Sequence, residues 1–214
     1  MDDARKALPA DTIILAVKPN VVPTVASQLA SQGIGQARIV SVAAGVSTAS
    51  LIDIFGAQTD VVRVMPNTPL ANGCGMSAVS GGAQTSPESV DLVRDMFAYM
   101  GAAVIIAEDQ QDIACAVSGS GPAYFELVVE SIAREAEKLG MDYQTALTLA
   151  VQTMKGTAVM LEETHQDLPA AIKAVSTPGG TTAAALEQMR AGGLESSLAD
   201  GVAAACKRSR ELGA

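Results

Sequence analysis

The stretch ARIVSVAAG at residues 37–45, followed by STASLIDIF at residues 47–55, decides the class of fold. The first stretch is a β-branched apolar run that ends in small residues, which predicts a buried parallel strand. The second has helical spacing behind a hydroxyl residue that can cap it, which predicts a short helix. A strand followed at once by a helix is the repeating unit of an open α/β sheet.

The same alternation extends to both sides of this unit, and then it stops. Further strands are predicted at 12–17, 61–65, 75–82 and 102–107, with helices at 20–30 and 86–100. After Glu108, helical periodicity replaces the strands, through segments 109–117, 121–139, 142–164, 167–175, 181–191 and 194–212. We therefore predict an α/β domain at residues 1–107, followed by an all-α domain at residues 108–214.

Composition and charge exclude several classes of function. The 214 residues are 49% hydrophobic, contain no Trp and carry a net charge of −9, which disfavours nucleic acid and anionic membranes as partners. The polar start contains no signal peptide, and no apolar run reaches the roughly 18 residues of a membrane span. Three scattered cysteines and one histidine, His165, provide no clustered metal site and no catalytic triad. We expect a cytoplasmic protein without a metal.

Three successive predicted strands end in loops that suit a ligand. Ligands of open α/β sheets bind at the carboxyl ends of the strands. ILAVKPNVV, residues 14–22, places four residues there: Ala16, Val17, Lys18 and Pro19. SVAAGV, residues 41–46, ends in small residues and a glycine, which allow a flat ligand to approach the backbone. In VMPNTPL, residues 64–70, two prolines restrict a loop that offers the Asn67 amide. Alone, the first loop is better explained as an ordinary turn, and the second is equally consistent with one. For the third loop a ligand is favoured over an Asn-Thr turn, because three successive strands end in such loops on one edge.

Two helix starts in the second half are rich in glycine and hydroxyl residues. SGSGPAY, residues 118–124, has two serines that can cap a helix, and glycines that leave N–H groups open to an anion. STPGGTT, residues 176–182, repeats the pattern. There Gly179 and Gly180 can adopt positive φ, and Thr181 or Thr182 is expected to cap the helix. A carboxylate at that helix start would meet amide donors and the positive end of the dipole. A plain helix–turn–helix junction is the alternative.

The segment at 145–161 is apolar on nearly every side. A helix without a polar face must be buried. In a helical half of this size, a partner subunit is the favoured source of that burial, and a core helix within one chain is the alternative.

A glycine pattern that is typical of dinucleotide binding occurs in the wrong place. GCGMSA, residues 73–78, fits G-x-G-x-x-A, but it leads into a predicted strand instead of opening a helix. Only 11 residues precede Thr12, too few for a further strand–helix unit of roughly 30 residues.

Four motifs in this order and spacing resemble pyrroline-5-carboxylate reductase: ILAVKP, MPNTP, SGSGPAY and STPGGTT. The resemblance runs from about Asp11 to the C-terminus. It implies reduction of 1-pyrroline-5-carboxylate to L-proline with NADPH or NADH, the last step of proline biosynthesis. It also implies a Rossmann domain followed by a C-terminal helical dimerisation domain, in a family member that here lacks roughly its first quarter, the N-terminal part of the Rossmann domain. The family forms homodimers, often assembled into larger rings of dimers.

The resemblance also implies roles for individual residues. Ala16, Lys18 and Pro19 match the nicotinamide-ribose side of the cofactor site; Ala43, Ala44 and Gly45 match a second cofactor loop; Asn67 lies beside the nicotinamide. Glu108 matches an acidic residue near the substrate. Thr177, Gly180 and Thr181 match positions that hold the substrate carboxylate. Thr182 matches the threonine that hydrogen-bonds the ring nitrogen. Thr177 stands where the family usually has Ser, which keeps the hydroxyl.

Two other interpretations compete with this one. The chain can be a catalytically inactive helical dimer that binds proline-like acids. It can also be a related β-hydroxyacid-type dehydrogenase, which would need a catalytic lysine near the domain junction. Lys138 and Lys155 are available, although neither lies in a recognised motif.

Overall fold

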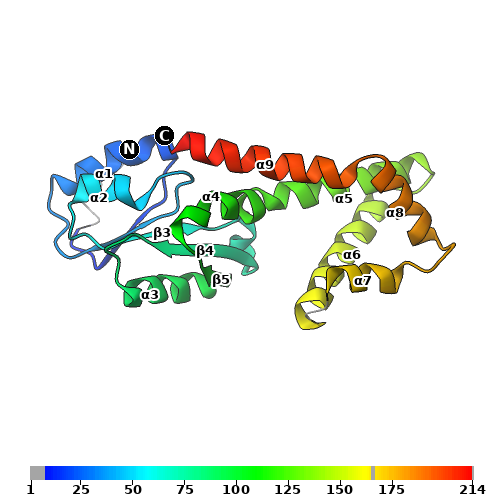
Figure 1. Ribbon diagram of the computed structural model, residues 1–214, viewed down its shortest axis with the longest axis horizontal. Helices are drawn as coiled ribbons and strands as arrows, with labels where there is room; N and C mark the ends of the chain where they lie inside the picture. The colour runs from blue at the N-terminus through cyan, green and yellow to red at the C-terminus, as the bar shows by residue number, and fades with distance from the viewer. Residues whose placement is uncertain (1–7, 165–166, 214) are drawn as a thin grey trace. The chain divides into compact units, whose positions relative to one another are not determined.

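The structure is a computed structural model that describes residues 8–164 and 167–213 (Figure 1). Contacts divide the chain into two compact units. The first ends at Pro122 and takes up the chain again from Val202, and the second spans Ala123–Gly201. The division at residues 107 and 108 drawn from the sequence marks the change from strands to helices, whereas the boundary between the compact units lies later in the chain.

The first unit contains a five-stranded sheet in the order β1-β2-β3-β4-β5. Its strands are Thr12–Leu15, Arg38–Ser41, Val61–Met65, Gly75–Gly81 and Gly101–Ile105. β1, β2 and β3 run parallel, β4 runs antiparallel to β3, and β5 runs parallel to β4. All five predicted strands are confirmed. The reversal at β4 follows from the short connection Thr68–Asn72 (η3), because a parallel crossover needs a dozen or more residues.

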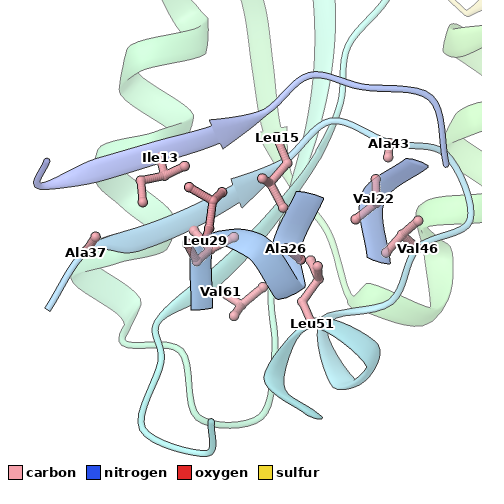
Figure 2. Close-up of a cluster of buried hydrophobic side chains, with 11 residues drawn as sticks. Ile13, Leu15, Val22, Ala26, Leu29, Ala37, Ala43, Val46, Leu51 and Val61 are labelled. Atoms are coloured by element: carbon pink, nitrogen blue, oxygen red, sulfur yellow. The ribbon is translucent and has the colours of Figure 1, made fainter. Parts of the chain in front are cut away.

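Helices cover both faces of this sheet, and each face has its own core. The helices of this unit are η2 (Pro19–Val21), α1 (Val22–Ala30), α2 (Thr48–Phe55), α3 (Pro87–Ala98), η4 (Glu108–Gln110), α4 (Gln111–Ala114) and the π-helical turn η5 (Cys115–Gly119). On one face, Ile39 of β2 packs in a cluster with residues of α1 and α2. Figure 2 shows Ala26 of α1 and Leu51 of α2 in this cluster. On the other face, its neighbour Val40 packs in a cluster with α3. This alternation is what a strand buried on both faces requires.

The cap predicted for α2 is confirmed, and α3 begins in the same way. Ser47 accepts a hydrogen bond from the Ser50 N–H, and Ser86 accepts one from the Ser89 N–H. Pro87 occupies the first turn of α3, where its missing N–H removes no bond. The hydroxyl residue that ends one loop therefore determines where each helix begins.

The second unit is helical. Its helices are α5 (Gly121–Lys138), α6 (Tyr143–Thr164), α7 (Leu168–Val175), α8 (Thr181–Ala191) and α9 (Leu194–Leu212). α5 starts and α9 ends within the first unit. The predicted ranges of α8 and α9 are confirmed residue for residue. In α6 the buried residue is Ala146, while Leu149 and Met154 are exposed, so the alternative that α6 is a core helix of its own chain is wrong.

A polar cluster joins α5 to α6 within this unit. The Tyr143 hydroxyl donates to Glu130, and the Arg134 guanidinium both pairs with Glu130 at 2.8 Å and lies 4.3 Å from the centre of the Tyr143 ring. The Tyr143 hydroxyl, and then Arg134, hold the pKa of Glu130 below its ordinary value of 4.5. The hydrogen bond to Glu130 raises the pKa of Tyr143 above its ordinary value of 10.0.

The cluster makes a pH-dependent contribution to stability that can be measured. Because the pKa of Glu130 is lowered by folding, its contribution is present above 4.5 and is lost as the pH falls through the folded value. Because the pKa of Tyr143 is raised by folding, its contribution is present below 10.0 and is lost as the pH rises through the folded value. We expect Tyr143→Phe to lower the thermal midpoint at pH 7, and the difference to shrink below pH 4.5.

The control for this prediction is Tyr99→Phe, because Tyr99 is 91% exposed. It should leave the thermal midpoint unchanged at both pH values. All samples are compared at one protein concentration, since self-association shifts the midpoint. A Tyr143→Phe difference that stays constant from pH 3 to pH 7 would contradict the assigned cause.

Candidate functional site

The carboxyl ends of β1, β2 and β3 meet at one edge of the sheet because the three strands are parallel and in register. Leu15 of β1 pairs with Ser41 of β2, and Ser41 pairs with Arg63 of β3. The loops predicted for a cofactor therefore lie at this edge. Residues 16–19 follow β1, residues 43–45 follow β2, and Asn67 follows β3.

These loop residues differ in what their side chains do. Ala16, Val17 and Lys18 are exposed, and the Lys18 carbonyl accepts a hydrogen bond from the Val21 N–H, which starts η2. Ala43 is 7% exposed and belongs to the core cluster shown in Figure 2, so a ligand at this loop would meet its backbone.

Gly45 requires glycine for a reason that the sequence does not reveal. Its φ of +78° lies in the left-handed region, and a Cβ atom there would sit 2.7 Å from the Gly213 nitrogen and the Ser209 carbonyl oxygen. The close neighbour of this backbone is thus the end of α9.

Asn67 is held in place by its own side chain. Its Oδ1 accepts a hydrogen bond of 2.8 Å from the Met76 N–H at the start of β4. This bond uses only the oxygen of the amide. The nitrogen Nδ2 carries two N–H donors in addition, because a carboxamide both donates and accepts hydrogen bonds. The loop between Pro66 and Pro69 therefore presents a fixed polar group next to the end of β3.

Glu108 lies at the centre of a network in the first unit. Its Oε1 accepts from the Thr48 N–H at 2.7 Å and from Arg63 Nη1 at 3.3 Å, and its Oε2 accepts from the Thr48 hydroxyl at 2.6 Å. The carboxylate thereby caps α2 at its positive end and pairs with a buried arginine. Sequence reasoning missed Thr48 and Arg63. The signal was present, because a charged residue inside the apolar run VVRVM needs a buried partner.

In the second unit, the STPGGTT segment forms a turn that leads into α8. The Gly180 N–H donates to the Thr177 carbonyl at 3.0 Å, and Gly179 has a φ of +73°. α8 begins at Thr181, and no side chain caps it. The expectation that Thr181 or Thr182 is the cap is wrong, because extended Gly180 occupies the cap position and both threonines lie inside the helix.

The first turn of α8 therefore keeps the features that an acidic ligand needs. Its leading N–H groups have no side-chain partner. Among the described residues, the hydroxyls of Thr177, Thr181 and Thr182 make no hydrogen bond to the protein. Thr177 and Thr181 are exposed, and Thr182 is half-buried.

The SGSG segment has a different structure from the one expected. The Ser118 hydroxyl donates to the Ala114 carbonyl, so it does not cap α5. The Ser120 N–H donates to the Cys115 carbonyl at 2.8 Å, which closes a π-helical turn. A Cβ at Gly119 would lie 3.4 Å from the Met65 sulfur, an ordinary contact distance, so the turn lies beside the end of β3 without requiring glycine there.

Several further features named in the sequence analysis can be located in the described part of the chain. GCGMSA leads into β4 and opens no helix, as predicted. No group of His, Cys, Asp or Glu side chains among the described residues has the proximity to hold a metal ion. No helix within that part has the length and apolar character that crossing a bilayer demands. His165 lies outside the described residues. Lys138 pairs with Glu135 on the surface of α5, and Lys155 is exposed on α6.

Comparison with known proteins places these features in a family. A family model described as pyrroline-5-carboxylate reductase dimerisation matches residues 108–212. The pyrroline-5-carboxylate reductase of Corynebacterium melassecola is 37% identical over 216 residues, covering 99% of this chain and 80% of that protein. The structure of Plasmodium falciparum pyrroline carboxylate reductase with NADP bound has a TM-score of 0.92 and 28% identity, and covers 100% of this chain and 82% of that chain. The Coxiella burnetii pyrroline-5-carboxylate reductase has a TM-score of 0.90 and 33% identity, covering 100% of this chain and 80% of that chain.

A Rossmann-like sheet followed by a helical region, with ligand-compatible loops at the carboxyl edge, defines a protein of the dehydrogenase and reductase class. The identity and the coverage of the relatives then decide the family. This chain belongs to the pyrroline-5-carboxylate reductase family.

The hydrogen bonds of Glu108 predict that replacing its carboxylate by an amide lowers the stability of the first unit. We expect Glu108→Gln to destabilise the first unit by roughly 1.5–3 kcal/mol, because charge-assisted hydrogen bonds are lost and buried Arg63 keeps an uncompensated charge. The measurement is the urea midpoint of unfolding. Asp109→Asn is the matched control, since Asp109 is adjacent, exposed and loses the same charge. Equal midpoints for the two variants would contradict the role of Glu108.

Proposed function

We propose that this chain reduces 1-pyrroline-5-carboxylate to L-proline by hydride transfer from NADPH or NADH, as the last step of proline biosynthesis in the cytoplasm. The observation that carries the proposal is the edge of the sheet at which three parallel strands place the loops 16–19 and 43–45 and Asn67. Membership of the reductase family supports it, as does the NADP bound to the Plasmodium falciparum relative.

The residues at this edge fit a nicotinamide cofactor. Ala16 and the loop from Ala43 to Gly45 offer small side chains, and residues 16–19 offer backbone groups at the same edge, which let a flat ring approach the chain closely. Asn67 offers the donors of an amide whose oxygen is already fixed by Met76. We assign these residues to the nicotinamide-ribose side of the cofactor.

The start of α8 fits the substrate carboxylate. We assign Thr177, Gly179, Gly180 and Thr181 to this carboxylate. The first turn of α8 has N–H groups that no side chain caps, the hydroxyls of Thr177 and Thr181 are exposed, and the helix dipole has its positive end here, while the Gly180 N–H is bonded to the Thr177 carbonyl. Thr182, half-buried one residue later, is assigned to the ring nitrogen. Glu108 is assigned to the substrate side as well; each of its oxygens has two lone pairs, so a further contact is compatible with its bonds to Thr48 and Arg63.

The chemistry needs little from the protein beyond orientation. The bound cofactor supplies a hydride, and an imine carbon accepts it most readily when the nitrogen is protonated. The chain holds the carboxylate, contacts the nitrogen and fixes the face of the reacting ring, and such orientation contributes up to roughly 7–11 kcal/mol. Thr182 serves to orient the nitrogen, because an unperturbed threonine hydroxyl is a poor acid.

Removing the hydroxyl of Thr182 should lower the turnover rate without lowering the stability of the fold. We expect Thr182→Ala to lower kcat about threefold to tenfold, the value of one hydrogen bond, with the thermal midpoint nearly unchanged. Thr182→Ser keeps the hydroxyl and should retain most of the activity. The measurement is oxidation of NADPH and of NADH by the full chain with 1-pyrroline-5-carboxylate. Equal activity of Thr182→Ala would eliminate this role.

The same assay decides between the proposal and the inactive alternative. Turnover by the unaltered chain supports the reductase. Tight binding of proline without turnover would instead favour the inactive helical dimer that binds proline-like acids.

We also assign the chain to a homodimer, the unit from which a larger ring of dimers can be built. Large apolar residues of the second unit are exposed on several helices: Phe125, Leu127, Ile132, Leu149, Val151, Met154, Val159, Met160, Leu168 and Val175. An apolar groove of about 410 Å³ lies between α5, α8 and α9 in that unit. An apolar groove together with exposed apolar side chains is typical of an interaction site, and the matching dimerisation model supports a second copy as the partner.

A charge on α6 should break the dimer. We expect Met154→Glu to raise the dissociation constant for self-association at least about a hundredfold, because burying an unpaired carboxylate costs several kcal/mol. Gln152→Glu places the same charge on the same helix at an exposed polar position and serves as the control. Sedimentation velocity measures both. A monomeric unaltered chain at micromolar concentration would contradict the assignment.

A further inference from the structure

The end of α9 lies directly against the loop that follows β2. A Cβ added to Gly213 would sit 1.9 Å from the Gly45 carbonyl oxygen. A Cβ added to Gly45 would sit 2.7 Å from both the Gly213 nitrogen and the Ser209 carbonyl oxygen. Real Cβ atoms do not approach other atoms so closely, so the two backbones touch at a point where neither accepts a side chain.

Ala43 and Val46, on either side of the turn at this contact, pack into the core, whereas Ala44 and Gly45 in its middle lack such packing. Residue 42 is held by the bond from the Val42 N–H to the Leu15 carbonyl, and Thr48 is held by Glu108. Between these points, among the described residues, no hydrogen bond of the chain involves Ala44 or Gly45. The end of α9 is therefore the element that packs against the unbonded part of the loop.

The end of α9 is itself fixed to the sheet unit by a buried bond. The Ser209 hydroxyl donates to Asp112 Oδ1 at 2.6 Å, and Ser209 is only 3% exposed. Arg210 Nε lies 4.0 Å from the other oxygen of Asp112. Asp112 belongs to α4, which begins shortly after Glu108. The position of the last turn of α9 is thus set by α4.

From this geometry we infer that Ser209 and Gly213 are positioning residues for the cofactor. They hold the Ala43–Gly45 loop in the conformation that receives the nicotinamide side of NAD(P)H, and neither needs to touch the cofactor. This inference rests on the proposed function and extends it, because it assigns to the end of the helical region a part in cofactor affinity.

The inference predicts a change in one kinetic parameter. Ser209→Ala releases the anchor, and Gly213→Ala forces the two backbones apart. We expect each change to raise the KM for NADPH about threefold to tenfold, the range that corresponds to one lost hydrogen bond, while the KM for 1-pyrroline-5-carboxylate stays within about twofold. A general loss of structure would instead change both KM values and lower the thermal midpoint.

Two further variants sharpen the test. Ser209→Thr keeps the hydroxyl and should restore the KM for NADPH. Glu211→Gln changes a residue of the same turn whose side chain is exposed and pairs with Arg208, and it should match the unaltered chain. Unchanged cofactor KM in both Ser209→Ala and Gly213→Ala would overturn the inference while the proposed function stands.

A second measurement tests the inference without any activity. Amide hydrogen exchange of the full chain reports the opening of residues 44–46 directly. We expect faster exchange there in Ser209→Ala and Gly213→Ala, and no change in Glu211→Gln. If the unaltered chain fails to oxidise NADPH or NADH, the proposed function fails. Exchange at residues 44–46 that is the same in all variants would overturn the positioning role.

Discussion

The arrangement of the first unit depends on one compensated charge. Arg63 lies in the middle of β3 and is 7% exposed, so its guanidinium must have a partner. That partner, Glu108, is the residue at which the chain changes from strands to helices. Its carboxylate also receives the first N–H of α2, so a single side chain ties together β3, the start of α2 and the entry to the helical region. The loop after β2 lies immediately before α2, so the bonds of Glu108 to the start of α2 also fix the end of this loop.

Much of the fold could be predicted because it rests on local chemistry. The apolar runs and the caps Ser47 and Ser86 mark their elements without reference to the rest of the chain. The contacts that sequence reasoning missed join distant segments, as Arg63 and Thr48 do with Glu108. The error at the cap of α8 is local, because it depends on the extended backbone at Gly180, which the residue types leave open. Hydroxyl residues beside glycines were consistent with a cap or with a ligand site, and only the backbone geometry separates these possibilities.

The second unit illustrates why an apolar pattern alone does not say what covers it. α6 has apolar residues all round, and the chain itself leaves most of them exposed. The polar cluster of Glu130, Arg134 and Tyr143 fixes α5 against α6 without burying that surface. These polar bonds join two helices of the unit, and its apolar faces stay uncovered. Such faces are buried when the unit associates with a partner.

Glycine at a sheet edge has two explanations that sequence cannot separate. In the loop after β2, the sequence suggests that Gly45 leaves space for a flat ligand. The structure shows that Gly213 of the same chain fills part of this space. The two explanations are connected. Under the proposed function, this loop lets a cofactor approach on one side, and its middle has no hydrogen bonds of its own among the described residues, so support comes from the other side. Only a backbone without side chains fits so close, and the Ser209–Asp112 bond keeps that backbone in place.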